Sequence, residues 1–388
     1  MKILLGTPEY QPYHVGGGGE VYKQLAENYK KLGNEVVVVY GYYPTNSWSE
    51  EIKEYTKDGI KFYQIPEIPY PKSMPFLRTV MPPNPKSWFK LKAIIKKENP
   101  DVAHLHGYGF LLVNKLAKIL KKQNVKYIFT LHGYPETQNK KGFLAKILYG
   151  TFEKFSIQKA LKGSSKITGV SDYISQDTRI SKFQDKTLTV LNGINQEEYL
   201  ENKGNKSLDI YKELLLKKGK DLTIFSMGRI SKMKGFHLVI EKMNFFIKNG
   251  INLHYIIAGT EDGFEKELKE LIKKEGLDNN VHLIGWRSKK DIISLLHQCD
   301  LFSIPSLWDP CPIAAFEGMA CNKLIITTES GGMKEIFKNY PYKINIYNKN
   351  FDRELLKIIK NKEYKNLKKI DLSNLSWKNV SNKYLEII

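Results

Sequence analysis

The sequence predicts an α/β protein of two domains, each built on a mostly parallel sheet flanked by helices. A length of 388 residues fits two such domains better than one. Short apolar segments rich in β-formers alternate with longer helical patterns, which is typical of βαβ units. The alternation pauses in a polar stretch over residues 192–220 and then restarts. We therefore place the first domain at residues 1–195 and the second at residues 196–375.

In the first domain the expected strands are residues 2–6, 35–40, 60–65, 101–105, 126–131, 166–170 and 187–191. The expected helices are residues 18–32, 87–97, 111–122, 144–161 and 171–180. In the second domain the expected strands are residues 221–227, 253–259, 281–284, 300–304 and 323–327, and the helices are residues 236–248, 264–275, 289–298 and 312–320. A last helix at residues 376–388 has apolar side chains at helical spacing.

Composition narrows the class of protein and the compartment. Three scattered cysteines, Cys299, Cys311 and Cys321, form no C-x-x-C pair, which argues against a disulfide scaffold or a zinc site. The first residues have too short an apolar run for a signal peptide, and no stretch is long enough to span a bilayer. We expect a cytoplasmic protein that can also lie peripherally on the inner face of a membrane.

The net charge of +20 is carried mainly by the first half, where residues 1–195 hold 29 Lys and Arg against 16 Asp and Glu. Nucleic acid, an anionic bilayer and acidic small molecules are all compatible with it. Lysine-rich solvated helix faces would explain the charge equally well. No zinc finger, KH-type or RNP-type motif is present, so we expect no nucleic-acid partner.

A run of glycines, Gly16 to Gly19, follows the first expected strand and opens a helix at Glu20. Glycine lets the backbone approach a ligand closely, and a helix N-terminus presents free N–H groups to phosphate or sugar hydroxyls. The spacing is neither that of the dinucleotide fingerprint nor that of a P-loop. A flexible surface turn is the alternative explanation.

Histidines stand at the ends of two further strands, in DVAHLHG (residues 101–107) and TLHG (residues 130–133). His106 and His132 suit a cleft in which they hydrogen-bond a sugar, whereas His104 fits a structural role within the strand. Two histidines spaced by one residue can ligate a metal, but no carboxylate or thiol cluster accompanies them, so we expect no metal and no cofactor.

The segment Gly228–Arg229–Ile230–Ser231–Lys232–Met233–Lys234–Gly235 follows the first strand of the second domain and precedes a helix. Arg229 can bind two phosphate oxygens with its planar fork, and Lys234 supplies a point charge. With the helix N-terminus they could neutralise a pyrophosphate without a metal and stabilise a departing nucleoside diphosphate. A basic loop in a basic protein is the alternative.

A fourth segment runs from Ile304 through PSLWDPCPIAAFEGMA to Ala320. It places Asp309 on a loop and Glu317 on a helix, with Pro312 expected at an early helical position. The loop can aim backbone N–H groups and a carboxylate at sugar hydroxyls; two unrelated charges are the alternative. A further glycine turn, Gly331–Gly332, enters a helix that carries Glu335.

Taken in order, these motifs resemble the family-4 retaining glycosyltransferases, which have two facing Rossmann-like domains (the GT-B architecture). The resemblance covers nearly the whole chain. It rests on the glycine run with EVYKQLAENYKKLGNEV, then PDVAHLHG, TLHG, VSDYI, LNGIN, GRISKMKG, PSLWDPCP with FEGMA, and SWKNVSNKYLE. The last resembles the family's closing helix, which usually packs back on the first domain.

The resemblance implies a role for individual residues. Arg229 and Lys234 would hold the donor diphosphate, with Gly228 in the same turn. Asp309 would lie near the transferred sugar and Glu317 would bind the ribose hydroxyls. The backbone at Cys311 and Ile313 would face the sugar, and Glu335 would lie on the donor side. His132 would lie beside the donor sugar; Gly17 and Gly18 would face the diphosphate, and Gly16, Gly17 and His106 the acceptor.

Two positions depart from the family pattern: Asp309 stands where the family has the first Glu of its E-x7-E motif, and Pro312 replaces a common Gly. Both bear on the identity of the donor sugar. The resemblance implies transfer of a hexose from a UDP- or GDP-sugar to a glycan or lipid-linked acceptor in polysaccharide or glycoconjugate synthesis. The WDPC stretch also resembles starch and glycogen synthases, and a nucleotide-sugar epimerase of the same architecture is the other alternative.

One expected amphipathic helix, residues 87–97, bears on the identity of the acceptor. It carries four lysines together with aromatic and aliphatic residues, and an apolar stretch, residues 75–82, lies upstream. Basic side chains beside exposed apolar ones would suit an anionic membrane surface and a lipid-linked acceptor. An ordinary helix that packs on the core is the alternative. The residues are Lys90, Lys92, Lys96, Lys97, Trp88, Phe89, Leu91, Ile94 and Ile95.

Overall fold

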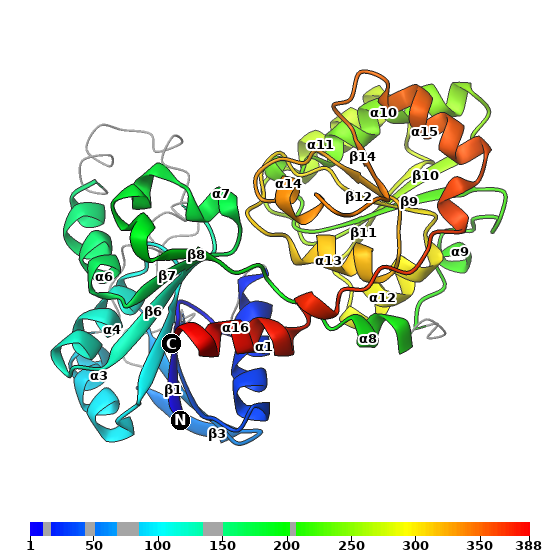
Figure 1. The fold of residues 1–388 in the computed structure, drawn as a ribbon. Coiled ribbons are helices and arrows are strands. Elements are labelled where there is room, and N and C mark those ends of the chain that lie inside the picture. Colours follow the sequence, from blue (N-terminus) through cyan, green and yellow to red (C-terminus); the bar gives the residue numbers. More distant parts are fainter. Residues whose placement is uncertain (11–16, 43–50, 68–84, 135–149, 202–206) are drawn as a thin grey trace. The chain divides into compact units, whose positions relative to one another are not determined.

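The computed structural model describes residues 1–10, 17–42, 51–67, 85–134, 150–201 and 207–388. The chain forms two compact units (Figure 1). Met1–Asn192 and Trp377–Ile388 make the first unit, and Gly193–Ser376 makes the second. The boundaries expected from the sequence, after residues 195 and 375, fall beside those after Asn192 and Ser376.

An eight-stranded sheet forms the centre of the first unit, in the order β3-β4-β2-β1-β5-β6-β7-β8. All neighbouring strands are parallel except β3 and β4, which are antiparallel. The central strands are buried apolar runs, as a parallel sheet covered on both faces requires. The strands are β1 (Lys2–Thr7), β2 (Glu35–Tyr42), β3 (Lys53–Lys57), β4 (Ile60–Pro66), β5 (Val102–His106), β6 (Lys126–Leu131), β7 (Lys166–Gly169) and β8 (Thr187–Thr189).

The helices of the first unit cover this sheet. They are α1 (Gly18–Lys31), α3 (Pro85–Glu98), α4 (Leu111–Lys122), the π-helix η1 (Glu153–Ile157), α6 (Gln158–Gly163), α7 (Asp172–Ser175) and the 3₁₀ segment η2 (Thr178–Lys186). The C-terminal helix α16 (Trp377–Ile387) lies beside α1 (Figure 1) and buries Trp377, Val380 and Tyr384. The chain therefore ends in the unit in which it begins.

The second unit has a six-stranded parallel sheet in the order β11-β10-β9-β12-β13-β14. Its strands are β9 (Leu222–Met227), β10 (Leu253–Ala258), β11 (Val281–Gly285), β12 (Leu301–Ile304), β13 (Ile325–Thr327) and β14 (Lys343–Asn345). Its helices are α8 (Gln196–Glu201), α9 (Ile210–Glu213), η4 (Lys232–Lys234), α10 (Phe236–Lys248), α11 (Glu265–Lys274), α12 (Lys289–Gln298), α13 (Ile313–Ala320), α14 (Met333–Ile336), α15 (Phe351–Lys360), η5 (Glu363–Lys365) and η6 (Ser373–Leu375).

Several features differ from the sequence expectation, among them helices α8, α9 and α15, which lie where no helix was expected. Strands β3 and β14 were not expected; one is mostly exposed and the other is three residues long, so neither has a clear apolar pattern. The helix expected at residues 171–180 ends at Ser175 and gives way to η2, where the Asp177 carboxylate accepts from the Arg179 backbone N–H. In the helix expected at 144–161, residues 144–149 lie outside the described part, and the chain has π geometry from Glu153 to Ile157.

The strand order places a switch point in each sheet. In the first unit the chain extends from β1 to one side and later continues from β5 on the other; in the second unit β9 and β12 are the corresponding neighbours. Ligands of open parallel sheets bind beyond the carboxyl ends of the strands at such points. The glycine run and His106 follow or end β1 and β5, and Lys234 and Asp309 follow β9 and β12.

Candidate functional site

The second unit's candidate site is built from loops that leave β9, β12 and β13. The loop after β9 ends at Gly235, whose φ of 67° favours glycine and whose position admits no side chain. A Cβ there would lie 1.9 Å from the carbonyl oxygen of Pro305, in the loop after β12. The backbones of the two loops are therefore in direct contact, and Gly235 is the residue that permits it.

The loop after β9 is also fixed against β10. The backbone N–H of Ile230 donates to the carbonyl of Thr260 at 2.7 Å, and that of Gly228 donates to Ala258 at 2.9 Å. A Cβ at Gly259 would lie 1.8 Å from the Gly228 carbonyl oxygen. Backbone pairing thus continues past the strand ends and positions the segment that carries Arg229.

The Lys234 ammonium donates to the Asp309 carboxylate, with 2.7 Å between Nζ and Oδ2. The exposed fractions of the two side chains are 26% and 12%, so water screens this ion pair only partly. The motifs after β9 and β12, 75 residues apart in sequence, therefore meet in one place. The sequence predicted each residue for the site, but not the contact between them.

The loop after β13 hydrogen-bonds to the loop that carries Asp309. The backbone N–H of Gly332 donates to the Asp309 carbonyl at 3.0 Å, and the Thr328 hydroxyl donates to the Ser306 carbonyl at 2.5 Å. Gly331 has a φ of 64°, and a Cβ there would lie 2.5 Å from the Asp309 carbonyl oxygen. The glycine turn before Glu335 thus serves to hold the Asp309 loop.

Arg229 is engaged by a residue that sequence reasoning missed. Its guanidinium forms an ion pair with the Asp262 carboxylate, and 45% of the arginine side chain is exposed. Each expected phosphate-binding cation therefore has a carboxylate partner in this structure. Asp262 lies 33 residues from Arg229, and no motif around it indicated the contact.

Helix α13 carries Glu317, which is half-buried. The Tyr199 hydroxyl, from α8, donates to Glu317 Oε1. Ile313 begins this helix, whereas Pro312 is its N-cap with a ψ of 122°, so the expectation that Pro312 occupies an early helical position is wrong: extended ψ keeps it outside the helix. Cys311 is buried, and Glu335 lies half-buried on α14.

The second unit also has an exposed aromatic residue that the sequence reading passed over. Trp286 directly follows β11 and is 71% exposed, at the carboxyl end of a strand of the same sheet. An exposed indole ring at this edge of the sheet can pack on the flat ring of a ligand. The glycine directly before it, Gly285, was the available sequence signal.

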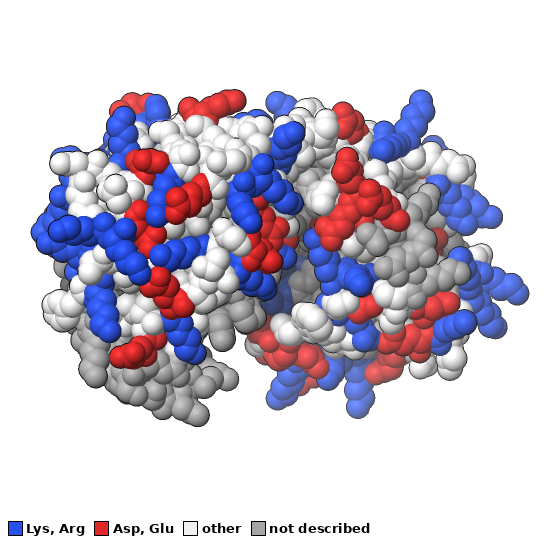
Figure 2. Space-filling model, turned by 90° about the horizontal axis from the view of Figure 1, so that it is seen from below, with Lys and Arg blue, Asp and Glu red and all other residues white. Residues whose placement is uncertain are grey.

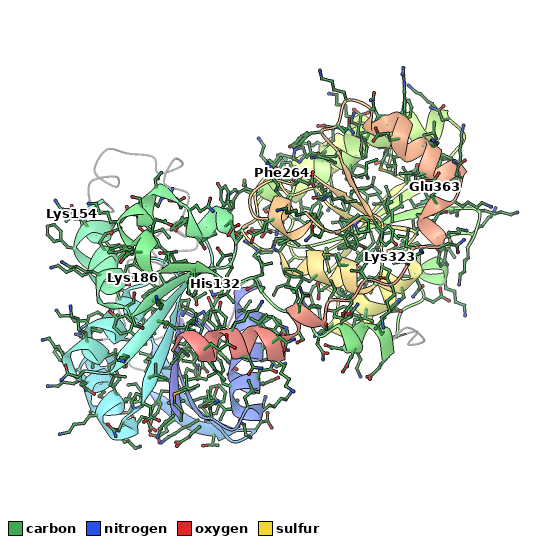
Figure 3. All side chains as sticks on the ribbon, viewed as in Figure 1. His132, Lys154, Lys186, Phe264, Lys323 and Glu363 are labelled. Carbon is green, nitrogen blue, oxygen red and sulfur yellow. The ribbon has the colours of Figure 1, made fainter. Side chains whose placement is uncertain are left out.

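The first unit's candidate site is a row of histidines along the ends of β5 and β6. The His106 Nδ1 and His132 Nε2 atoms are 2.9 Å apart, and the His104 and His106 rings are tilted to one another with centroids 4.0 Å apart. His132 is labelled in Figure 3, just past the end of β6. Tyr22 of α1 packs its ring on both His106 and His132. The structure thus brings together the histidines expected to line this site.

His104 has the structural role that the sequence suggested. Its Nδ1 lies 2.8 Å from the Tyr29 hydroxyl and its Nε2 lies 2.6 Å from the Thr130 hydroxyl, so both ring nitrogens are satisfied deep in the unit. Tyr384 of α16 packs on the same ring. The C-terminal helix therefore contacts the histidine row at His104.

Burial keeps these imidazoles neutral. It lowers the pKa of His132 to about 4 and holds the pKa values of His104 and His106 well below their usual range. Within the part of the chain that the structure describes, His106 Nε2 is buried and has no hydrogen-bond partner. A bare lone pair there costs less than an orphaned N–H, which favours His106 Nδ1–H donating to His132 Nε2 and places the His132 proton on Nδ1.

The glycine run is described only in part. Gly16 lies outside the described residues. Gly17 is the exposed N-cap of α1, with helical φ and ψ, and Gly18 is the helix's first residue. Gly17 has no side chain with which to cap this end of α1. Among the described residues no group of three or more metal-ligating side chains gathers.

Two family models match the chain in succession. Residues 15–198 match the family described as Glycosyltransferase Family 4, and residues 209–370 match Glycosyl transferases group 1. An uncharacterised glycosyltransferase of Methanocaldococcus jannaschii is 25% identical over 91% of this chain and 86% of its own length. A glycogen synthase of Streptococcus equi subsp. zooepidemicus is 24% identical over 88% and 86% respectively.

Solved structures show the same fold. A sucrose-phosphate synthase from Thermosynechococcus elongatus aligns over 100% of this chain and 98% of its own, with a TM-score of 0.74 and 15% identity. The Anabaena protein HepE, solved in complex with UDP and glucose, aligns over 100% and 98%, with a TM-score of 0.69 and 15% identity.

Proposed function

This chain belongs to the group 1 and family 4 glycosyltransferases of GT-B architecture, and on that premise we propose that it transfers a hexose from a UDP- or GDP-sugar to a glycan or lipid-linked acceptor with retention of configuration. The observation that carries the proposal is the Lys234–Asp309 ion pair at the β9–β12 switch point. It combines a cation for a phosphate with a carboxylate for a sugar hydroxyl at the place where ligands of such sheets bind.

A departing nucleoside diphosphate is the group whose charge this site is suited to stabilise. Lys234 has three N–H donors, so it can keep Asp309 and still donate to a phosphate oxygen. Helix α10 begins directly after its N-cap Gly235, one residue past Lys234, and adds the positive end of its dipole. These fixed charges act without a metal ion, which is why we propose metal-independent transfer.

We propose the following transfer step, which these charges support. The bond between the sugar's anomeric carbon and the diphosphate oxygen breaks, and a bond from the acceptor hydroxyl oxygen forms on the same face. The hydroxyl proton passes to the departing diphosphate. Lys234 stabilises the charge that appears on the diphosphate, and Arg229 can join it by exchanging Asp262 for a phosphate.

In this proposal the histidine row of the first unit is a neutral site for hydroxyl groups. With its proton on Nδ1, His132 can donate to a hydroxyl of the donor sugar, while His106, Gly16 and Gly17 form the acceptor side. Neutral imidazoles recognise hydroxyls without attracting an anionic diphosphate. The HepE complex with UDP and glucose is support for a donor of this class.

The donor test is a thermal-shift screen against UDP-, GDP- and ADP-glucose and UDP- and GDP-mannose. A donor that binds only the folded protein raises the melting temperature by mass action. We expect one UDP- or GDP-sugar to give the largest shift, and incubation of that donor with lipid-linked and oligosaccharide acceptors to release the free diphosphate. An ADP-sugar preference would favour the glucosyltransferase alternative; no shift with any donor would refute the proposal.

A lipid-linked acceptor gains support from helix α3. Its apolar stripe, Leu91, Ile94 and Ile95, packs on the core, as the ordinary amphipathic alternative predicted, yet Phe89 is 80% exposed among exposed lysines. The upstream residues 75–82 lie outside the described part. Figure 2 shows one face of the molecule, on which lysine and arginine side chains are interspersed with carboxylates. Within the described residues, no helix is both long and apolar enough to cross a membrane.

We therefore propose that the exposed end of α3 contacts an anionic membrane surface. Cosedimentation with vesicles of phosphatidylglycerol and phosphatidylcholine tests it at low salt. The protein should sediment with the anionic vesicles. A double variant that combines Phe89→Ala with Lys92→Ala should bind them more weakly. Equal recovery in the supernatant with and without anionic lipid would contradict membrane contact while leaving the transfer proposal intact.

A further inference from the structure

The contact between Tyr199 and Glu317 joins two segments that lie far apart in the chain. Tyr199 lies on α8, shortly after the chain enters the second unit, and Glu317 lies on α13, 118 residues later. The Tyr199 hydroxyl and Glu317 Oε1 are 2.5 Å apart, a separation common for a hydroxyl that donates to a carboxylate. Helices α8 and α13 pack on one another, so the contact belongs to a packed interface within the unit.

Tyr199 is held in place from several sides. Only 1% of the residue is exposed, and its backbone carbonyl accepts from His297 Nε2 at 2.6 Å. Lys289 lies over its ring with 5.9 Å to the centroid and also pairs with Glu198 at 2.7 Å. A hydroxyl fixed in this way has one direction in which to donate.

The chemistry of the two groups settles which of them donates. Burial, with the neighbouring Glu317 carboxylate, holds the pKa of Tyr199 well above its usual range, so the phenol keeps its proton. The phenol O–H therefore donates and the carboxylate accepts. Because a carboxylate is rigid, fixing Oε1 also fixes the direction of Oε2.

We infer that Tyr199 is a positioning residue for Glu317: its hydroxyl orients the carboxylate that contacts the ribose of the nucleotide. The inference rests on the proposed function, which places the ribose at Glu317. A carboxylate on a helix surface otherwise samples several rotamers, and ordering it on binding costs affinity. Tyr199 removes that cost before the nucleotide arrives.

The inference predicts a loss that depends on the ribose hydroxyls. Tyr199→Phe keeps the ring and its packing but removes the donor. Calorimetric titration of the wild-type protein with UDP and GDP first identifies the nucleotide that binds more tightly. Tyr199→Phe should bind that nucleotide about 5- to 20-fold more weakly than wild type does. The 2′,3′-dideoxy form of the same nucleotide, which lacks the hydroxyls that Glu317 contacts, should bind both proteins equally.

A matched variant separates positioning from general destabilisation. The Tyr340 hydroxyl donates to the Lys323 carbonyl at 2.6 Å, at the amino end of β13 and so at the opposite edge of the sheet from the site; Lys323 is labelled in Figure 3. Tyr340→Phe also loses one buried tyrosine hydrogen bond, and it should bind the nucleotide as wild type does.

A double-mutant cycle completes the test. In a Glu317→Ala background Tyr199→Phe should cause no further loss of affinity, because the two residues act as one unit. The inference is overturned if Tyr199→Phe binds the nucleotide as tightly as wild type, if the dideoxy form is weakened equally, or if the two losses add. A wild-type protein that binds neither UDP nor GDP would instead overturn the proposed function, and the inference with it.

Discussion

The two switch-point edges of this chain differ in charge. In the second unit, Arg229 and Lys234 lie at the edge and each is paired with a carboxylate. In the first unit, the corresponding edge carries a row of histidines that burial keeps neutral. On the proposed function, this difference suits the second unit's sheet edge to a charged ligand and the first unit's edge to hydroxyl groups.

The largest expected effect on transfer comes from removing Lys234, the cation at the second unit's charged edge. Lys234→Ala should lower kcat/KM for transfer by about 10²–10³-fold, because the charge on the leaving diphosphate loses a fixed donor. Initial rates with the donor found in the thermal-shift screen measure it. Lys242→Ala is the matched control, since it also removes a partly exposed lysine ion pair, to Asp352 at 3.1 Å, in the same unit. Equal rates for the two variants would contradict the distinction.

The backbone junction that supports the charged edge gives the next effect. Gly235→Ala should lower the free energy of unfolding by about 3 kcal/mol, from positive φ together with overlap on the Pro305 carbonyl. Gly250→Ala, with a φ of 80° and open space around it, should cost only about 1 kcal/mol. Urea titration compares them, and similar losses would mean that the loops after β9 and β12 do not touch.

Asp309→Asn separates phosphate binding from transfer at the charged edge. Removing the carboxylate takes a negative charge away from the place where the phosphates bind, so UDP affinity should stay the same or rise. The rate of transfer should fall about 10- to 100-fold, because the sugar loses a charged acceptor. Calorimetry and initial rates measure the two separately; parallel losses in both would show that Asp309 instead supports the fold.

The pH dependence of the free energy of unfolding tests the neutral edge of the first unit. A folded-state pKa of about 4 for His132 lies below its ordinary value near 6.5, so its contribution to stability is present above pH 6.5 and is lost as the pH falls toward 4. Each such histidine adds about 1.4 kcal/mol per pH unit to that slope. His132→Gln should therefore show a shallower decline of unfolding free energy between pH 6.5 and 5. An unchanged slope would mean that His132 already titrates normally.

The smallest effect concerns Trp286. If the exposed Trp286 ring contacts the base, Trp286→Ala should weaken the binding of UDP by about 5-fold, or ~1 kcal/mol. The binding of inorganic pyrophosphate should not change. Competition titration of the two ligands measures it. A variant that loses affinity for both would place the ring beside the phosphates.

Much of this fold could be predicted because its strands are apolar runs of parallel sheets and its helices have clear periodicity. The β3 strand escaped because its side chains are mostly exposed and polar, and β14 because it is three residues long. At the site, the residues were predicted but several partners were not. The Arg229–Asp262 and Tyr199–Glu317 contacts join residues far apart in sequence, and no local spacing encodes them.

The central claim is that Lys234 holds the diphosphate, and calorimetric titration of UDP, UMP and uridine tests it most directly. Wild type and Lys242→Ala should bind UDP far more tightly than UMP or uridine. Lys234→Ala should lose most of that preference while binding uridine unchanged. A Lys234→Ala protein that keeps the full preference for UDP would contradict the account.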